Sequence, residues 1–119
     1  MSAGEIKRLP ARFFENENGT TPVLDWLRGL CAEDKKSVGE TIKTVEFGWP
    51  VGLPVCRPIS NRKGLWEVRA DVSDGKIARV FFCIDGGEMV LLHGIIKKSQ
   101  KTPKNDLDTA VKRQKGLRR

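Results

Sequence analysis

The chain has 119 residues, of which 39% are hydrophobic and 31% charged, as in an ordinary globular protein. This length suits one modest core, so we expect a single domain over residues 1–119. The net charge of +7 favours an anionic partner such as nucleic acid or an acidic protein, with a merely soluble basic surface as the alternative. No apolar run approaches the roughly 20 residues that cross a bilayer, and the N-terminus lacks the apolar segment of a signal peptide. We therefore expect a cytoplasmic protein with no membrane partner.

The cysteines and the single histidine exclude two kinds of structural site. Cys31, Cys56 and Cys83 are widely spaced, and only His93 accompanies them. This pattern argues against a paired disulfide framework and against a zinc site of the CxxC type. We expect reduced thiols, no metal and no cofactor.

The first part of the chain predicts one strand and two helices. Residues 5–14 form a weak strand, which Pro10 confines to a sheet edge or interrupts because proline has no N–H to donate. Thr21-Pro22 has the chemistry of a helix start, and apolar residues recur at helical spacing up to Leu30. A second helix follows and ends at Gly48-Trp49-Pro50. The short connection between the helices predicts an antiparallel hairpin.

The second part predicts three strands and a last helix. Residues 51–64 are rich in proline and glycine and are expected to be irregular. Apolar strands follow at residues 65–71, 77–84 and 89–96, separated by glycine-containing turns. Pro103 then begins a C-terminal helix. The order β-α-α-β-β-β-α predicts an α+β domain: an antiparallel sheet of the N-terminal strand and a three-strand meander, with the helical hairpin on one face and a short C-terminal helix.

Loop lengths decide which basic side chains share a face of the sheet. A three-residue loop Ser73-Asp74-Gly75, with its glycine left-handed, places Arg69 directly opposite Arg79. If Gly86-Gly87 is a two-residue turn, Lys98 also lies on the face of Arg79. A two-residue Asp74-Gly75 turn would instead separate the two arginines. The first register gathers Arg69, Arg79 and Lys98 on one surface.

Arg79 interrupts an otherwise apolar strand, so it must be solvated, paired or used in function. Glu67 or Asp71 on the neighbouring strand can neutralise it. Alternatively, Arg79 belongs to a cationic pocket that binds a phosphate and stabilises the charge that develops when the phosphate is attacked. Arginine suits this role because its guanidinium is planar and permanently charged. Both interpretations stay open at this stage.

Several short motifs make the chain similar to a known protein family. They are Leu65-Trp66-Glu67-Val68-Arg69, Ala78-Arg79-Val80-Phe81-Phe82, Leu91-Leu92-His93-Gly94, Lys97-Lys98 and Gln100-Lys101-Thr102-Pro103. With these motifs, the chain resembles the RelE/ParE toxin superfamily, and most closely its phage-derived HigB-like branch. The likeness spans nearly the whole chain, and the segment from Leu91 to Pro103 is its most specific part.

The resemblance implies a RelE-like fold and the toxin of a type II toxin–antitoxin pair. Most HigB- and RelE-like members are endoribonucleases that cut messenger RNA in the ribosomal A site without a metal. The ribose 2′-hydroxyl attacks the adjacent phosphate, and basic residues stabilise the phosphorane. The positions that match the family's basic catalytic residues are Arg69, Arg79, Lys97 and Lys98. The implied partners are the ribosome, mRNA and a cognate antitoxin, expected to be a helix-turn-helix protein of the HigA type.

Other residues are candidates for RNA contact or proton transfer. The candidates for RNA binding are Arg57, Arg62, Lys63, Gln100 and Lys101, with a solvated loop as the alternative. RelE-like nucleases often place a tyrosine near the C-terminus, but this chain has none, so the general base is unassigned. His93 has suitable chemistry. The register above turns it away from Arg79, however, and a core histidine with one satisfied nitrogen is the alternative.

Two other functions fit the same pattern. A ParE-like protein inhibits DNA gyrase by binding and without cleavage, but it would not need Arg79 together with Lys97-Lys98 on the sheet. A non-catalytic RNA-binding module would use the same positive surface.

Overall fold

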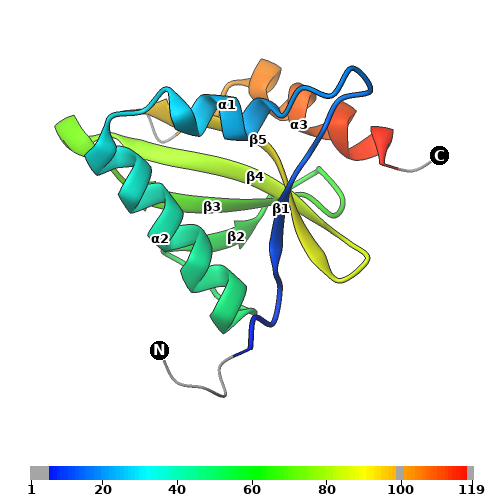
Figure 1. The fold of residues 1–119 in the computed structure, drawn as a ribbon, viewed down its shortest axis with the longest axis horizontal. Coiled ribbons are helices and arrows are strands. Elements are labelled where there is room, and N and C mark those ends of the chain that lie inside the picture. The colour runs from blue at the N-terminus through cyan, green and yellow to red at the C-terminus, as the bar shows by residue number, and fades with distance from the viewer. Residues whose placement is uncertain (1–5, 99–100, 118–119) are drawn as a thin grey trace.

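The computed structural model describes residues 6–98 and 101–117. Within these residues the protein has a five-stranded mixed sheet, in the order β1-β5-β4-β3-β2, and three α-helices (Figure 1). The predicted α+β class is confirmed. In chain order the elements are β1 (Ala11–Phe13), α1 (Pro22–Arg28), α2 (Ala32–Gly48), β2 (Cys56–Pro58), β3 (Trp66–Asp71), the 3₁₀ turn η1 (Ser73–Gly75), β4 (Ile77–Asp85), β5 (Glu88–Lys97) and α3 (Lys104–Gly116).

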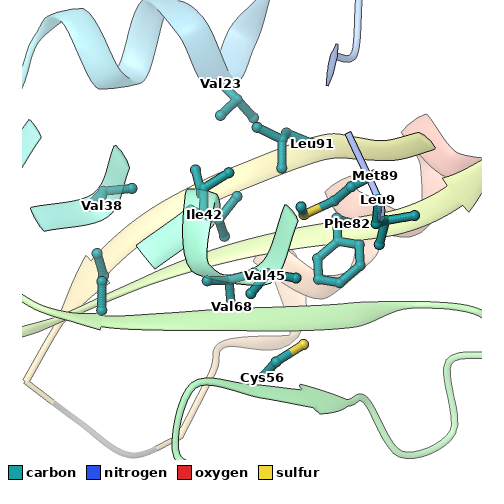
Figure 2. Packing of buried hydrophobic residues seen from close by; sticks show 13 residues of the cluster. Leu9, Val23, Val38, Ile42, Val45, Cys56, Val68, Phe82, Met89 and Leu91 are labelled. Atoms are coloured by element: carbon teal, nitrogen blue, oxygen red, sulfur yellow. The ribbon is translucent and has the colours of Figure 1, made fainter. Parts of the chain in front are cut away.

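Helices cover both faces of the sheet. On one face, called the α1/α2 face, the two helices bury an apolar cluster that includes Val23, Val45 and Leu91 (Figure 2). On the other, the α3 face, Ala110 joins a second cluster around Phe81. The predicted helix pair on one face is confirmed, but α1 and α2 diverge, because α1 packs on β5 and α2 on β3 (Figure 1).

The N-terminal strand corrects the predicted sheet. Of the expected strand 5–14, only Ala11–Phe13 forms β1, after Pro10 and at the sheet edge. β1 runs parallel to β5, so the prediction of an antiparallel sheet is wrong. The reason is that the chain crosses over through two helices and the meander before β5 returns in the direction of β1. Glu46 of α2 accepts a hydrogen bond from the backbone N–H of Ala11 (2.7 Å), which covers part of this edge.

A second correction concerns residues 51–64, which contain a strand instead of being wholly irregular. Cys56–Pro58 forms β2 and pairs antiparallel with β3 at the other edge of the sheet. Pro58 fits there because an edge strand has a partner on one side only. This short strand places Arg57 directly opposite Glu67.

The pairing of β4 with β5 contains a β-bulge. Phe81 pairs with His93, whereas Phe82 pairs with Leu91, so Leu92 is an extra residue on β5. The bulge shifts the register of everything that follows it on β5 by one residue. Side chains that simple alternation assigns to one face therefore lie on the other.

After the bulge, β5 passes close to a tryptophan of α1. A Cβ atom added to Gly94 would lie 2.5 Å from Cε3 and Cζ3 of Trp26. Gly94 is therefore required by the space that the indole ring occupies, and α1 packs directly on the backbone of β5.

We expect Gly94→Ala to destabilise the protein by about 1–3 kcal/mol, because the new methyl group would displace the ring of Trp26. The measurement is urea unfolding. The matched control is Gly39→Ala in α2, where a Cβ meets nothing within 4 Å. That change should stabilise the protein by about 0.5–1 kcal/mol through the better helix propensity of alanine. A Gly94→Ala protein as stable as wild type would contradict the packing described.

The turn between β3 and β4 is fastened to the start of α2. The carboxylate of Asp34 accepts hydrogen bonds from the backbone N–H and the hydroxyl of Ser73, both at 2.9 Å. These hydrogen bonds hold the pKa of Asp34 below its ordinary value, and the bond from the backbone N–H of Ser73 has the largest effect. The contact steadies the turn that sets the pairing of β3 with β4.

This depressed pKa predicts a pH-dependent contribution to stability. Asp34 stabilises the native state above the pKa of about 3.9 that it has when unfolded, and the contribution disappears as the pH falls through the native pKa. Asp34→Asn should therefore lower the free energy of unfolding at pH 7 and lower it much less at pH 3. Denaturant unfolding of both proteins at the two pH values measures the difference. An equal loss at pH 3 and pH 7 would contradict this assignment.

Candidate anion-binding site

Arg69 of β3 and Arg79 of β4 lie directly opposite each other on the α3 face. The loop Ser73-Asp74-Gly75 sets this register, with positive φ angles of 60° at Asp74 and 68° at Gly75. The predicted opposition of the two arginines is therefore confirmed. Two like charges in facing positions repel each other unless a counter-charge lies between them.

The β-bulge changes which residues of β5 accompany them. Arg79 pairs with Ile95, so alternation places His93 and Lys97 on its face. Lys98 was predicted to lie on the face of Arg79 and His93 on the opposite face. Both predictions are wrong, because neither included the extra residue of the bulge. Lys97 is partly buried at the end of β5, and Lys98 follows the strand in an exposed position.

The carboxylate of Glu67 lies among three guanidinium groups. Its Oε1 is 2.9 Å from Nε of Arg57 and 3.8 Å from Nε of Arg69, and its Oε2 is 3.2 Å from Nη1 of Arg79. The side chains of Glu67 and Arg79 are fully buried, whereas 40% of Arg57 and 19% of Arg69 is exposed. We call these four residues, from β2, β3 and β4, the arginine cluster.

The composition of the arginine cluster explains both its stability and its charge. A buried arginine is tolerated when a carboxylate pairs with it and accepts its hydrogen bonds. The pairing of Arg79 with Glu67, one of the two interpretations of this residue, is confirmed. The four residues of the cluster carry three guanidinium groups and one carboxylate. Arg57 and Arg69 are the two arginines of the cluster that reach solvent.

The neighbouring thiol is not a nucleophile at neutral pH. Cys56 is buried, and desolvation, together with the negative charge of Glu67, raises the pKa of Cys56 to about 11. The protonated thiol is unreactive.

The exposed side of the arginine cluster is accessible. α3 packs over β4 and β5, whereas the cluster reaches solvent at β2 and β3. Arg69 also lines an open cavity of about 240 Å³ with Pro54, Val55 and Asp71. Guanidinium groups held at the edge of an open surface can form paired hydrogen bonds with a phosphate.

The predicted RNA-binding residues are divided between different places. Arg57 belongs to the arginine cluster, while Arg62 and Lys63 lie in the β2–β3 loop beside α3. Gln114 of α3 donates a hydrogen bond to the carbonyl of Lys63 (3.1 Å), and Nη2 of Arg62 lies 3.8 Å from Oδ1 of Asp108. The loop is thus held against the helix, and both basic residues line a cavity of about 470 Å³.

The last two predicted contacts follow β5. Lys101 is exposed, and Gln100 lies outside the residues that the structure describes.

His93 joins β5 to α3 through both ring nitrogens. Its Nε2 is 2.7 Å from Oδ1 of Asp106, and its Nδ1 is 3.3 Å from Nη1 of Arg113. A guanidinium only donates, so Nδ1 accepts and Nε2 carries the proton given to Asp106, a tautomer assigned from the network. Asp106 and Arg113 were not predicted to be partners of His93. Asp106, Ala110 and Arg113 follow one another at helical spacing and therefore share one face of α3. This spacing could have indicated that Asp106 and Arg113 contact the same residue.

Across residues 6–98 and 101–117, no three His, Cys, Asp or Glu side chains gather in a group that could hold a metal ion. No helix in these ranges combines the length and the apolar character needed to cross a membrane.

The buried carboxylate should matter far more for stability than the exposed arginine that it pairs with. Glu67→Gln leaves a buried guanidinium without its counter-charge, and we expect a loss of roughly 3–5 kcal/mol in the free energy of unfolding. Arg57→Gln removes a half-exposed partner and should lower the free energy of unfolding by about 1 kcal/mol or less. Guanidinium chloride unfolding of the two variants compares them. Glu67→Gln being no less stable than Arg57→Gln would contradict the account of the cluster.

Comparison with known families adds one match. Residues 25–115, the larger part of the chain, match the family described as phage-derived protein Gp49-like (DUF891). This family is associated with RelE-like toxins of toxin–antitoxin systems. No protein of curated function matches the sequence. The matched range includes β2 to β5 and thus the whole arginine cluster.

Proposed function

The chain belongs to the phage-derived Gp49-like family, and from this premise we propose that it is the toxin of a type II toxin–antitoxin pair. We further propose that it is an endoribonuclease of the RelE-like, HigB-like kind, which cuts messenger RNA on the ribosome and so inhibits translation. The sequence resemblance to that superfamily supports the narrower assignment. The observation that carries it is the arginine cluster, in which three guanidinium groups share one buried carboxylate on an open part of the sheet.

The proposed reaction needs positive charge at one phosphate. The 2′-oxygen attacks the adjacent phosphorus, its proton is removed, and the bond to the 5′-oxygen breaks as that oxygen takes up a proton. Negative charge accumulates on the phosphorane in between, and pre-positioned cations lower its energy. Arg57 and Arg69 are the exposed groups that would contact this phosphate. Lys97, on the same face, would add a further charge beside them.

Arg79 has a different role in this proposal. Its side chain is fully buried and its Nη1 is held by Glu67 at 3.2 Å. It therefore acts as a positioning residue, because it fixes the carboxylate that orients Arg57 and Arg69. Lys98 lies beyond the strand and outside this arrangement.

Membership of the family also implies an antitoxin partner. A protein with a net charge of +7 is best neutralised by an acidic surface. We propose that the antitoxin, a helix-turn-helix protein of the HigA type, places carboxylates against Arg57 and Arg69.

Induction of the protein in bacterial cells should stop growth and protein synthesis, and the double variant Arg57→Gln/Arg69→Gln should relieve the arrest. Both arginines are partly exposed, so the variant should fold, which circular dichroism checks. The matched control is Lys35→Gln/Lys36→Gln, which removes the same charge from exposed positions on α2. It should remain as toxic as wild type.

Two results would contradict the proposal. One is a folded double variant that is as toxic as wild type, which would exclude the arginine cluster as the site. The other is growth arrest in which protein synthesis continues while DNA damage accumulates, which would favour inhibition of DNA gyrase by binding.

A further inference from the structure

A separate cavity lies at the β1 side of the sheet, away from the arginine cluster at the β2 side. Its volume is about 590 Å³, within the range of small-molecule sites. One wall is the segment after β1, from Phe14 to Glu17, and the other is the second half of α3, from Thr109 to Gly116. Figure 1 shows the loop after β1 beside this part of α3.

Opposite charges face this cavity from its two walls. The loop contributes Glu15 and Glu17, and α3 contributes Lys112, Arg113 and Lys115. None of these five side chains forms an ion pair with any residue of the ranges 6–98 and 101–117. The walls thus hold their charges apart, and a ligand with both an anionic group and hydrogen-bond donors can bridge them.

Arg113 gives the cationic wall a fixed donor. Its Nη1 donates to the carbonyl of Leu92, the extra residue of the β-bulge, at 2.8 Å and lies 3.3 Å from Nδ1 of His93. Desolvation lowers the pKa of Arg113 from its ordinary value. Within the described ranges, its Nε and Nη2 have no hydrogen-bond partner and no carboxylate forms an ion pair with it. A partly buried guanidinium held by neutral acceptors favours an anion from outside the chain.

The carboxylates of Glu15 and Glu17 restrict the kind of base that the ligand can carry. Carboxylates only accept hydrogen bonds, so a base that binds there must present donors. Guanine offers N1–H and the N2 amino group side by side on one edge, whereas uracil offers a single N3–H between two carbonyl oxygens, which a carboxylate repels. A phosphate on the same molecule suits the cationic wall.

We propose that this cavity binds a guanine mononucleotide, with its phosphate at Arg113 and Lys112 and the donors of its base at Glu15 and Glu17. This site is distinct from the arginine cluster and does not depend on the proposed ribonuclease activity.

Calorimetric titration of the full chain with guanosine 5′-monophosphate, uridine 5′-monophosphate and inorganic phosphate tests the proposal. The guanine nucleotide should bind at least about tenfold more tightly than either of the others, because only it engages both walls. In NMR spectra, the backbone amide signals of residues 14–17 and 109–116 should shift when the guanine nucleotide binds. Lys112→Gln and Glu17→Gln, both at exposed positions, should each weaken binding about tenfold, while Lys36→Gln on α2 should leave it unchanged.

The outcomes separate this site from the first one. Guanine nucleotide binding that survives in Arg57→Gln/Arg69→Gln supports a separate site, whatever that variant does to toxicity. Equal affinity for the guanine and uracil nucleotides, amide shifts confined to the surroundings of Arg57 and Arg69, or no binding at millimolar nucleotide would each overturn the proposal.

Discussion

The buried carboxylate of Glu67 is the group on which the charged face of the sheet depends. Arginines of three neighbouring strands converge on it, and two of them face each other directly. Without the carboxylate, Arg69 and Arg79 would bring like charges together in a medium of low polarity. With it, the fold tolerates a fully buried Arg79. The same carboxylate holds Arg57 and Arg69 where they can meet an anion from solvent.

The β-bulge at Leu92 organises the other side of the same face. It turns His93 toward α3, where Asp106 and Arg113 engage both ring nitrogens. It also supplies the carbonyl that fixes the guanidinium of Arg113. α3 is thereby tied to β5, and it leaves the arginine cluster uncovered near β2 while forming a wall of the cavity near β1.

The part of this arrangement that follows from local geometry was predictable from the sequence. The sequence allows two lengths for the turn that contains Gly75, and the three-residue loop, which places Arg69 opposite Arg79, is the one that forms. The strand that ends at Pro58 was not predicted, because three residues are too few to show hydrophobic alternation and they lie in a segment rich in proline and glycine. The bulge was missed because Leu91 and Leu92 are both apolar, so the hydrophobic pattern does not reveal the shift of register. The contacts of α3 depend on how it docks, which local patterns do not contain.

The most direct test of the central claim is a map of messenger RNA 5′ ends at nucleotide resolution, made shortly after induction of the protein. If the arginine cluster of Arg57, Glu67, Arg69 and Arg79 cleaves mRNA on the ribosome, new ends with a free 5′-hydroxyl will appear inside translated codons. They will be absent from cells that express the folded Arg57→Gln/Arg69→Gln protein. Growth arrest by the wild-type protein without any new 5′ ends would contradict the account.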